Sequence, residues 1–387
     1  MQPILECCCG VDVHKDMIEA CIIKGVENPV LIREQFRTFP DELQAFVAWL
    51  YENDCYHIAM ESTGVYWRAV YEAIEEFSPY YESIIVSNAH NMRNLPGRKT
   101  DVKDAEWIAT LLQHGLLEPS FVPNRIIRDL REFSRTYKNS IGEKSRCLNR
   151  LEKFLQTHGF KLSSVLSDIN SLSGIRILTV LSEQGSLSVE DVKNAISSNT
   201  KKSATEIQSA ICGRLNPNEC FLLNDFLEQL RIIQMHIDKI LSKMQEIAAP
   251  YANIIEQLDS IVGIDITAAL LILAEIGPTP QENFKNSAHL CSWAGLSPRN
   301  DQSAGKIKSK KILPGNPYIK SILCQVSWSA VRSRKTPFGM WFWSNQGRLG
   351  KKKAIVAVSR KILSLIYYLL STGQFYDNEV AMRPFLN

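Results

Sequence analysis

Four acidic residues near the start of the chain have the types and spacing that could support metal chemistry. Asp12 stands near the end of the apolar run 4–13, where a lone carboxylate is costly unless it meets a cation, a hydrogen-bond donor or a proton. Glu61 ends a second apolar run, and Asp101 and Asp104 share a face at the start of a predicted helix. Carboxylates from separate elements suit hard divalent cations, chiefly Mg²⁺. Such ions support phosphodiester cleavage by stabilising the leaving oxygen.

The last two acids also have a purely structural interpretation. Asp101 could cap the helix, and Asp104 could be a first-turn charge that the helix dipole favours. Asp12 has no comparable role, because nothing in a strand requires an acid at that position.

A strongly basic segment, 296–361, forms the second region of chemical interest. It holds fifteen lysines and arginines against one acid, Asp301, while the rest of the 387-residue chain holds 29 basic and 40 acidic residues. The net charge of +3 conceals this asymmetry, which indicates a polyanion-binding region on a more acidic body. The candidate nucleic-acid contacts are Arg299, Lys306, Lys308, Lys310, Lys311, Lys351, Lys352 and Lys353.

Ser303 lies within this segment, in a predicted loop between Pro298 and Ile312. Serine is a weak nucleophile that needs activation, and neighbouring cations would suit a scissile phosphate. Ser309 is similarly placed, however, and most loop serines are solvated turn residues. The spacing alone therefore does not single out Ser303.

Aromatic residues precede the later cluster of basic residues. Trp341, Phe342 and Trp343 come shortly before the lysines at 351–353. Aromatic and basic side chains together suit RNA or single strands, through stacking and phosphate contact. The same pattern also fits buried tryptophans beside a solvated helix face.

The pattern of apolar residues predicts an α/β region followed by an all-α region. Residues 1–120 give a mixed sheet with helices packed on it, from strands at 4–13, 17–24, 30–36, 56–60 and 83–86 and helices at 41–51, 65–77 and 100–114. Residues 121–249 are mostly helical, with long amphipathic helices at 125–157 and 222–247 that form a helical hairpin, an oligomerising coiled coil or a core pair. Residues 250–387 are helical again, joined by Gly- and Pro-rich turns.

The composition favours a soluble cytoplasmic protein. The ten cysteines fit no disulfide or zinc framework, so we expect buried free thiols in a reducing compartment. No apolar segment is expected to reach transmembrane length, and we expect no signal peptide, because the start of the chain lacks its features.

The motifs around these residues resemble the DEDD transposases of bacterial insertion sequences, a family that includes Piv/MooV-type invertases and bridge-RNA-guided recombinases. Three motifs resemble the family's RuvC-like domain of RNase H fold: Gly-Val-Asp-Val-His-Lys at 10–15, Met-Glu-Ser-Thr-Gly-Val-Tyr-Trp at 60–67 and Gly-Arg-Lys-Thr-Asp-Val-Lys-Asp-Ala at 97–105. The resemblance implies that Asp12, Glu61, Asp101 and Asp104 bind Mg²⁺, for which Mn²⁺ can substitute.

The second half resembles the family's C-terminal transposase domain. The motifs are Ile-Val-Gly-Ile-Asp-Ile-Thr-Ala at 261–268, Leu-Ala-Glu-Ile-Gly at 273–277, Trp-Ala-Gly-Leu-Ser-Pro-Arg at 293–299, Gln-Ser-Ala-Gly-Lys at 302–306 and Lys-Ile-Leu-Pro-Gly-Asn-Pro-Tyr-Ile-Lys at 311–320. The family's catalytic serine falls on Ser303. The resemblance also implies donor and target DNA, a bridge RNA and a tetramer.

Two positions depart from the family pattern. Ala304 replaces a glycine after the serine, a small change that should not remove the nucleophile. Asp265 stands in the family's Gly-x-Gly turn at 263–265, where an acid would weaken a backbone grip on phosphate. We therefore expect this turn to serve packing rather than direct DNA contact.

Two rival functions remain open from the sequence. The first is a RuvC-like nuclease that uses metal-activated water, with Ser303 structural. The second is a non-catalytic nucleic-acid scaffold, which the four placed acids argue against because a binder gains nothing from them.

Overall fold

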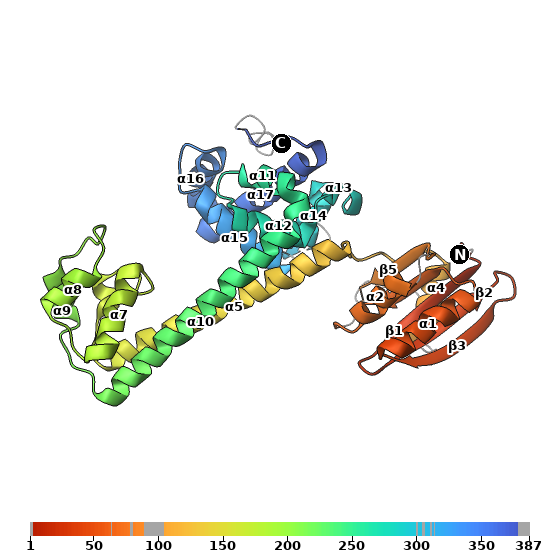
Figure 1. Ribbon diagram of the computed structural model, residues 1–387. Helices are drawn as coiled ribbons and strands as arrows, with labels where there is room; N and C mark the ends of the chain where they lie inside the picture. The colour runs from red at the N-terminus through yellow and green to blue at the C-terminus, as the bar shows by residue number, and fades with distance from the viewer. Residues whose placement is uncertain are drawn as a thin grey trace. The chain divides into compact units, whose positions relative to one another are not determined.

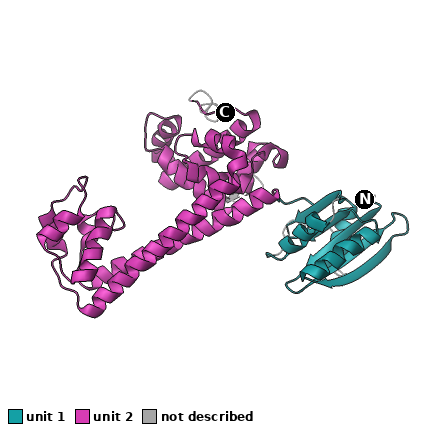
Figure 2. Cartoon of the chain, in the orientation of Figure 1, with its two compact units in different colours: residues 1–122 teal, residues 123–387 magenta. Residues whose placement is uncertain are grey.

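The computed structural model describes residues 3–62, 64–77, 80–88, 104–298, 301–303, 306–309, 312 and 314–377, and within 301–303 and 306–309 it describes the backbone alone. Contacts divide the chain into two compact units, residues 1–122 and 123–387 (Figure 2). Four predicted site residues lie outside the described ranges: Asp101, Arg299, Lys310 and Lys311. The three-part division at 1–120, 121–249 and 250–387 stays a proposal.

The first unit is a five-stranded mixed sheet with helices packed on it, as the sequence predicts (Figure 1). The strand order is β3-β2-β1-β4-β5; β1, β2 and β3 are antiparallel neighbours, whereas β4 and β5 run parallel to β1. Its elements are β1 (Cys7–Val13), β2 (Met17–Lys24), β3 (Val30–Arg37), α1 (Pro40–Glu52), β4 (His57–Glu61), α2 (Trp67–Phe77), β5 (Ser83–Ser87) and α4 (Asp104–Gln113).

The two faces of this sheet bury different side chains because neighbouring residues of a strand point to opposite sides. Val11 and Val13 of β1 join a core with Phe46 of α1 and Ile74 of α2. Cys8, two positions before Gly10, packs on the other face in a core built with α4. The sheet is therefore covered by α1 and α2 on one face and by α4 on the other.

The second unit is built on a pair of long antiparallel helices, α5 (Arg125–Thr157) and α10 (Pro217–Ile247) (Figure 1). They pack against each other within the chain, as shown by the hydrogen bond of 2.6 Å from Lys144 Nζ to Gln234 Oε1. The two helices thus form a hairpin within the chain, one of the arrangements that the sequence left open. α10 begins before the predicted residue 222, because Asn216 and Glu219 form a reciprocal capping box at its start.

Four helices lie between α5 and α10 in the chain and form a small bundle at one end of that pair (Figure 1). They are α6 (Leu162–Val165), α7 (Leu172–Gln184), α8 (Val189–Ala195) and α9 (Ala204–Ala210). We call residues 159–216 the tip bundle. Its core is shared with the adjoining ends of the long helices, through Leu151 and Leu155 of α5 and Leu223 and Leu230 of α10.

The remainder of the second unit is helical, as predicted, with one exception. Its elements are the 3-10 helix η1 (Ala249–Tyr251), α11 (Ala252–Asp259), α12 (Ile266–Ile276), α13 (Pro280–Asn283), α14 (Ser287–Trp293), β6 (Asp301–Ser303), β7 (Lys306–Ser309), α15 (Pro317–Ala330), α16 (Pro337–Leu349) and α17 (Lys351–Thr372). The exception is the hairpin β6–β7, which occupies the predicted loop between Pro298 and Ile312. Backbone pairing holds these strands, and their polar sequence gives no apolar alternation that would reveal them.

Among the described helices, α17 alone is long and apolar enough to span a membrane by length and composition, so the expectation that no segment reaches this length is wrong. The core helix of a soluble protein meets the same criterion. In α17, 56% of the most apolar window is buried within the protein, and the helix packs against α14, α15 and α16. We therefore interpret α17 as a core helix.

All ten cysteines are free thiols, which agrees with the absence of a disulfide framework in the sequence. Six are buried, but Cys212 is exposed, so the expectation of uniformly buried thiols is wrong at that position.

Candidate active site and nucleic-acid interface

The sheet of the first unit places Asp12 and Glu61 at the ends of adjacent parallel strands. The register pairs Gly10 with Ala59 and Val11 with Met60, so that Asp12 and Glu61 are the next residues along β1 and β4. Both lie two positions beyond residues that face α4, and alternation therefore brings both to the α4 face. Ligands of open α/β sheets commonly bind at the carboxyl ends of such strands.

Gly10 lets α4 approach this face closely enough to add the third acid. A Cβ atom at Gly10 would lie 2.2 Å from the carbonyl oxygen of Ala105 and 2.3 Å from the backbone nitrogen of Ala109, distances that no side chain tolerates. The first turn of α4 is also held by an ion pair between Arg33 of β3 and Glu106. Because α4 begins at Asp104, this packing brings its first carboxylate to the same edge as Asp12.

The electrostatics of Asp12 reflect this gathering of like charges. Burial raises the pKa of the Asp12 carboxyl, and the nearby charges of Asp104 and Glu61 raise it further, while His14 acts in the opposite direction. His14 Nε2 lies 3.1 Å from Asp12 Oδ2, and the Asp12 side chain is only 19% exposed. A bound divalent cation would relieve the repulsion between this partly buried carboxylate and its acidic neighbours.

The described acids have the right chemistry for a metal but do not form a complete site. Among the described residues, no group of three or more His, Cys, Asp or Glu side chains is arranged to hold a metal ion. The predicted fourth ligand, Asp101, lies outside these residues. The donor set of carboxylate oxygens fits Mg²⁺ or Mn²⁺, and Asp12, Glu61 and Asp104 are the residues that the fold brings together.

Ser303 is the last residue of β6, where the hairpin turns back toward β7. Its backbone pairs with that of Lys306, and the strands continue through Gln302 opposite Ile307. Lys306 and Lys308 therefore belong to the strand that runs beside the serine strand. An isolated bridge between Pro298 and Ile312 marks the base of the hairpin.

The three lysines at 351–353 occupy the first turn of α17 and are exposed. No side chain caps this helix, whose N-cap residue is Gly350. Cations at a helix N-terminus oppose the helix dipole, so these lysines do not stabilise α17. Their position suits an interaction with a polyanion.

The sequence left two roles open for the aromatic residues at 341–343, stacking on nucleic acid or burial in the core, and the three residues differ in their exposure. Phe342 is buried, whereas Trp343 is 38% exposed. The indole of Trp343 donates to the carbonyl of Val331 at 3.0 Å, and the guanidinium of Arg334 lies 4.2 Å from its ring centre. Trp341 is half-buried beside Lys361, whose Nζ is 5.4 Å from the ring centre.

The turn at 263–265 packs closely against α15. Gly263 has a φ of +93°, and a Cβ there would lie 2.7 Å from the backbone nitrogen of Ala330. Asp265 caps α12, because its side chain accepts a hydrogen bond of 2.7 Å from the backbone nitrogen of Ala268.

One buried network of charged residues was not predicted from the sequence. Glu275 of α12 is fully buried and contacts Arg131, Arg135 and Asn316. The signal was present, since Glu275 is a lone acid in an apolar run, as Asp12 is.

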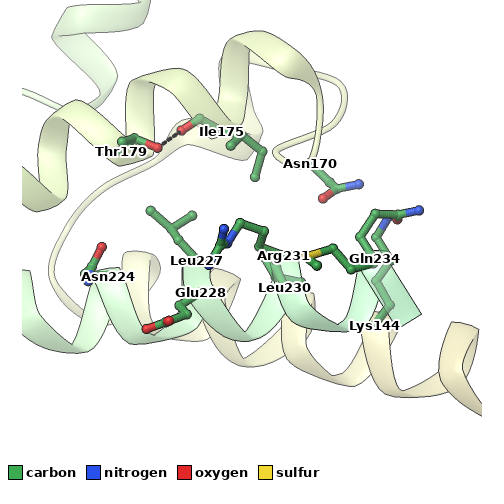
Figure 3. Close-up of a pocket in the computed structure, with 11 residues that line it drawn as sticks. Lys144, Asn170, Ile175, Thr179, Asn224, Leu227, Glu228, Leu230, Arg231 and Gln234 are labelled. Atoms are coloured by element: carbon green, nitrogen blue, oxygen red, sulfur yellow. Dashed lines mark hydrogen bonds between the residues drawn. The ribbon is translucent and has the colours of Figure 1, made fainter. Parts of the chain in front are cut away.

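A groove of about 720 Å³ lies beside the tip bundle, between α7 and α10 (Figure 3). Lys144, Asn170, Thr179 and Arg231 are among its lining residues. None of the predicted site residues lines it.

Comparisons with known proteins agree with the motifs. Residues 9–160 match the DEDD family model of IS110, described as a transposase, and residues 255–339 match a model described as the transposase IS116/IS110/IS902 family. Together these matches cover more than half of the chain. The fold and motifs thus define a transposase-type protein. The chain belongs to the IS110 family of transposases.

Relatives of known name align with parts of the chain. A protein of Sinorhizobium fredii named as a transposase, y4rJ, is 30% identical over 132 residues, which are 30% of this chain and 33% of that protein. The "Insertion element IS110 uncharacterized 43.6 kDa protein" of Streptomyces coelicolor is 24% identical over 156 residues, 40% of this chain and 36% of that protein. The chain spans about a third of the length of these relatives.

Proposed function

We propose that this protein is the transposase of an insertion sequence, which cleaves and exchanges DNA strands through a phosphoserine intermediate on Ser303. The observation that carries the proposal is the convergence of Asp12, Glu61 and Asp104 at one edge of the first unit, in a chain of transposase family. With Asp101, these acids would hold Mg²⁺, and the family implies that this unit has a RuvC-like fold. The strand order is compatible with that fold.

The chemistry is a transesterification at phosphorus. The Ser303 hydroxyl loses its proton and its oxygen attacks a DNA phosphate; the bond to one nucleotide oxygen then breaks, and that oxygen takes up a proton. The products are a covalent phosphoserine and a free DNA hydroxyl. A bound divalent cation would supply charge stabilisation for the phosphate and the leaving oxygen. The basic residues Lys306 and Lys308, on the strand beside Ser303, would attract the phosphate backbone.

The proposal extends to partners that the family resemblance implies. These are donor and target DNA, a bridge RNA that pairs with both, and a tetramer in which the serine and the acids of one site could come from different subunits. A cytoplasmic location fits the free thiols.

The test of this function is covalent trapping with a suicide DNA substrate. Full-length protein, DNA carrying the ends of the element and Mg²⁺ should give a protein–DNA adduct that survives denaturation, and a chelator should prevent it. Mapping the adduct by mass spectrometry should give Ser303. Undiminished trapping in chelator would refute the metal assignment, and an adduct on another residue would refute the serine assignment.

A metal-dependent nuclease that does not use serine chemistry is the second candidate. The observation in its favour is that the acids lie in a compact unit of their own. It predicts metal-dependent cleavage without any covalent adduct.

The lysines at 351–353 give a prediction for nucleic-acid binding. The triple variant Lys351→Ala, Lys352→Ala, Lys353→Ala should bind DNA more weakly and make the log–log salt dependence of binding shallower by about 2–3, because each lost phosphate contact removes roughly 0.9 from the slope. Fluorescence anisotropy over a series of KCl concentrations measures this slope.

The matched control replaces three lysines of the tip bundle, Lys193, Lys201 and Lys202, which are also exposed. This variant loses the same net charge and should keep the wild-type slope. Equal slopes for all three proteins would show that residues 351–353 do not contact phosphate.

A further inference from the structure

Glu275 is a buried charge whose partners come from two other parts of the second unit. Its side chain is fully buried. Asn316 Nδ2 donates to its Oε2 at 2.6 Å, and Arg135 Nε lies 3.4 Å from its Oε1. A buried carboxylate is very costly without such partners, so this set of contacts must form as a unit.

The arginine partners connect Glu275 to the long helix α5. Arg131 Nε lies 3.9 Å from Glu275 Oε2, and the same guanidinium donates to the backbone carbonyls of Ala274 at 3.0 Å and Glu275 at 2.8 Å. These carbonyls belong to the last turn of α12, where they lack partners within the helix. Arg131 therefore fixes the end of α12 against α5.

Asn316 connects Glu275 to the segment that carries Ser303. Its Oδ1 caps α15 by accepting hydrogen bonds from the backbone nitrogens of Tyr318 and Ile319, at 2.9 and 3.2 Å. Its backbone nitrogen donates to the carbonyl of Trp293, at the end of α14, at 3.0 Å. One residue thus joins the end of α14, the start of α15 and the buried carboxylate.

Both arms of the hairpin leave from this junction. A Cβ at Gly315 would lie 2.2 Å from the backbone nitrogen of Gly295, so the two backbones touch. Three residues beyond each of these glycines, Pro298 and Ile312 pair across the hairpin base. Charged side chains that contact this junction include those of the Glu275 network and the neighbouring Lys138, whose Nζ donates to the carbonyl of Tyr318 at 3.2 Å.

We propose that Glu275 and Asn316 are positioning residues, which hold the base of the β6–β7 hairpin so that Ser303 is presented in one orientation. The proposal rests on the proposed role of Ser303. The residues touch no reacting atom; they act by fixing the junction from which the hairpin leaves. Arg131 and Arg135 pair with the carboxylate and tie this junction to α5.

The test exchanges the donor and the acceptor of the pair. Asn316→Asp keeps an oxygen that can cap α15 but sets a second carboxylate against Glu275. The rate of adduct formation on suicide DNA should fall about 100-fold, as expected when reacting groups are misplaced by about 1 Å, while the Kd for DNA stays unchanged. The double variant Glu275→Gln, Asn316→Asp restores one carboxylate and one amide in reversed positions and should recover most of the rate.

A readout that does not depend on activity accompanies the rates. Hydrogen–deuterium exchange of peptides covering 301–309 should be faster in Asn316→Asp than in wild type and should return toward wild type in the double variant. If Asn316→Asp does not fold, Asn316→Ser takes its place, because serine also caps helices but lacks the amide donor.

The control is Ser359→Ala, which removes a buried hydrogen bond of 2.8 Å between Ser359 of α17 and Ser327 of α15. It should lower the Tm and leave both the adduct rate and the exchange at 301–309 unchanged. The proposal is overturned if Asn316→Asp reacts and exchanges like wild type, or if the double variant is no faster than the single one. If wild type forms no adduct on Ser303, the proposed function fails, and the exchange data alone decide whether Glu275 and Asn316 hold the hairpin.

Discussion

Ser303→Ala is expected to abolish the covalent protein–DNA adduct and to lower strand cleavage by on the order of a thousandfold or more, because loss of a covalent nucleophile removes the first chemical step. DNA affinity should persist, since the variant keeps every lysine and arginine of the basic segment 296–361. The measurement is denaturing electrophoresis of radiolabelled suicide DNA, with binding followed separately by anisotropy.

Ser309→Ala is the matched control for this variant. Ser309 lies on β7 of the same hairpin, opposite Asp301, so the control removes one hydroxyl from the same short element. It should form the adduct at a rate close to that of wild type. An adduct of normal yield in Ser303→Ala would instead favour the nuclease that does not use serine chemistry.

Asp12→Asn is expected to abolish cleavage while the protein remains folded. The variant keeps the shape of the side chain but removes a carboxylate that the charges of Asp104 and Glu61 repel. Burial and these like charges raise the pKa of the Asp12 carboxyl, so the folded state binds its proton more tightly than the unfolded chain does. In the absence of metal, this group's contribution to stability falls as the pH rises from its ordinary pKa through the raised one.

The thermal stability of the two proteins should therefore respond differently to metal. Without Mg²⁺ near neutral pH, Asp12→Asn should unfold at the same temperature as wild type or a higher one, because the variant lacks the repelling charge. With Mg²⁺, the Tm of wild type should rise, since a ligand that binds the folded state stabilises it, and the Tm of the variant should not. Differential scanning fluorimetry over a series of Mg²⁺ concentrations measures both.

Asp16→Asn makes the same chemical change four positions away, at an exposed turn residue. It should retain both cleavage and the Mg²⁺-dependent rise in Tm. A variant Asp12→Asn that cleaves DNA normally would remove Asp12 from the metal site.

The sequence predicted the elements that have a regular apolar period and missed those held by other forces. The runs at 17–24 and 30–36 located β2 and β3, and the amphipathic pattern of 125–157 located α5. The β6–β7 hairpin has polar residues on both strands and is held by backbone pairing, which leaves no pattern in the side chains.

The candidate site divides in the same way. Lone acids in apolar runs identified Asp12 and Glu61, but their pairing depends on the register of β1 with β4, strands about 50 residues apart in the chain. The role of Gly10 could not be predicted, because it depends on how closely α4 packs. Glu275 gave the same signal as Asp12, but its partners come from positions 131, 135 and 316, which no local pattern connects.

The tip bundle has a consequence for how such proteins can diverge. Its core is made of its own short helices and the adjoining ends of α5 and α10. The bundle lies at the C-terminal end of α5, a helix of 33 residues that is about 50 Å long. The family matches end at residue 160 and resume at 255, so nearly all of the bundle falls between them. Mutations there can repack one small core that contains neither the acids of the first unit nor the residues of the hairpin. The bundle is thus the part of the chain in which new surface properties can evolve while the residues for chemistry stay fixed.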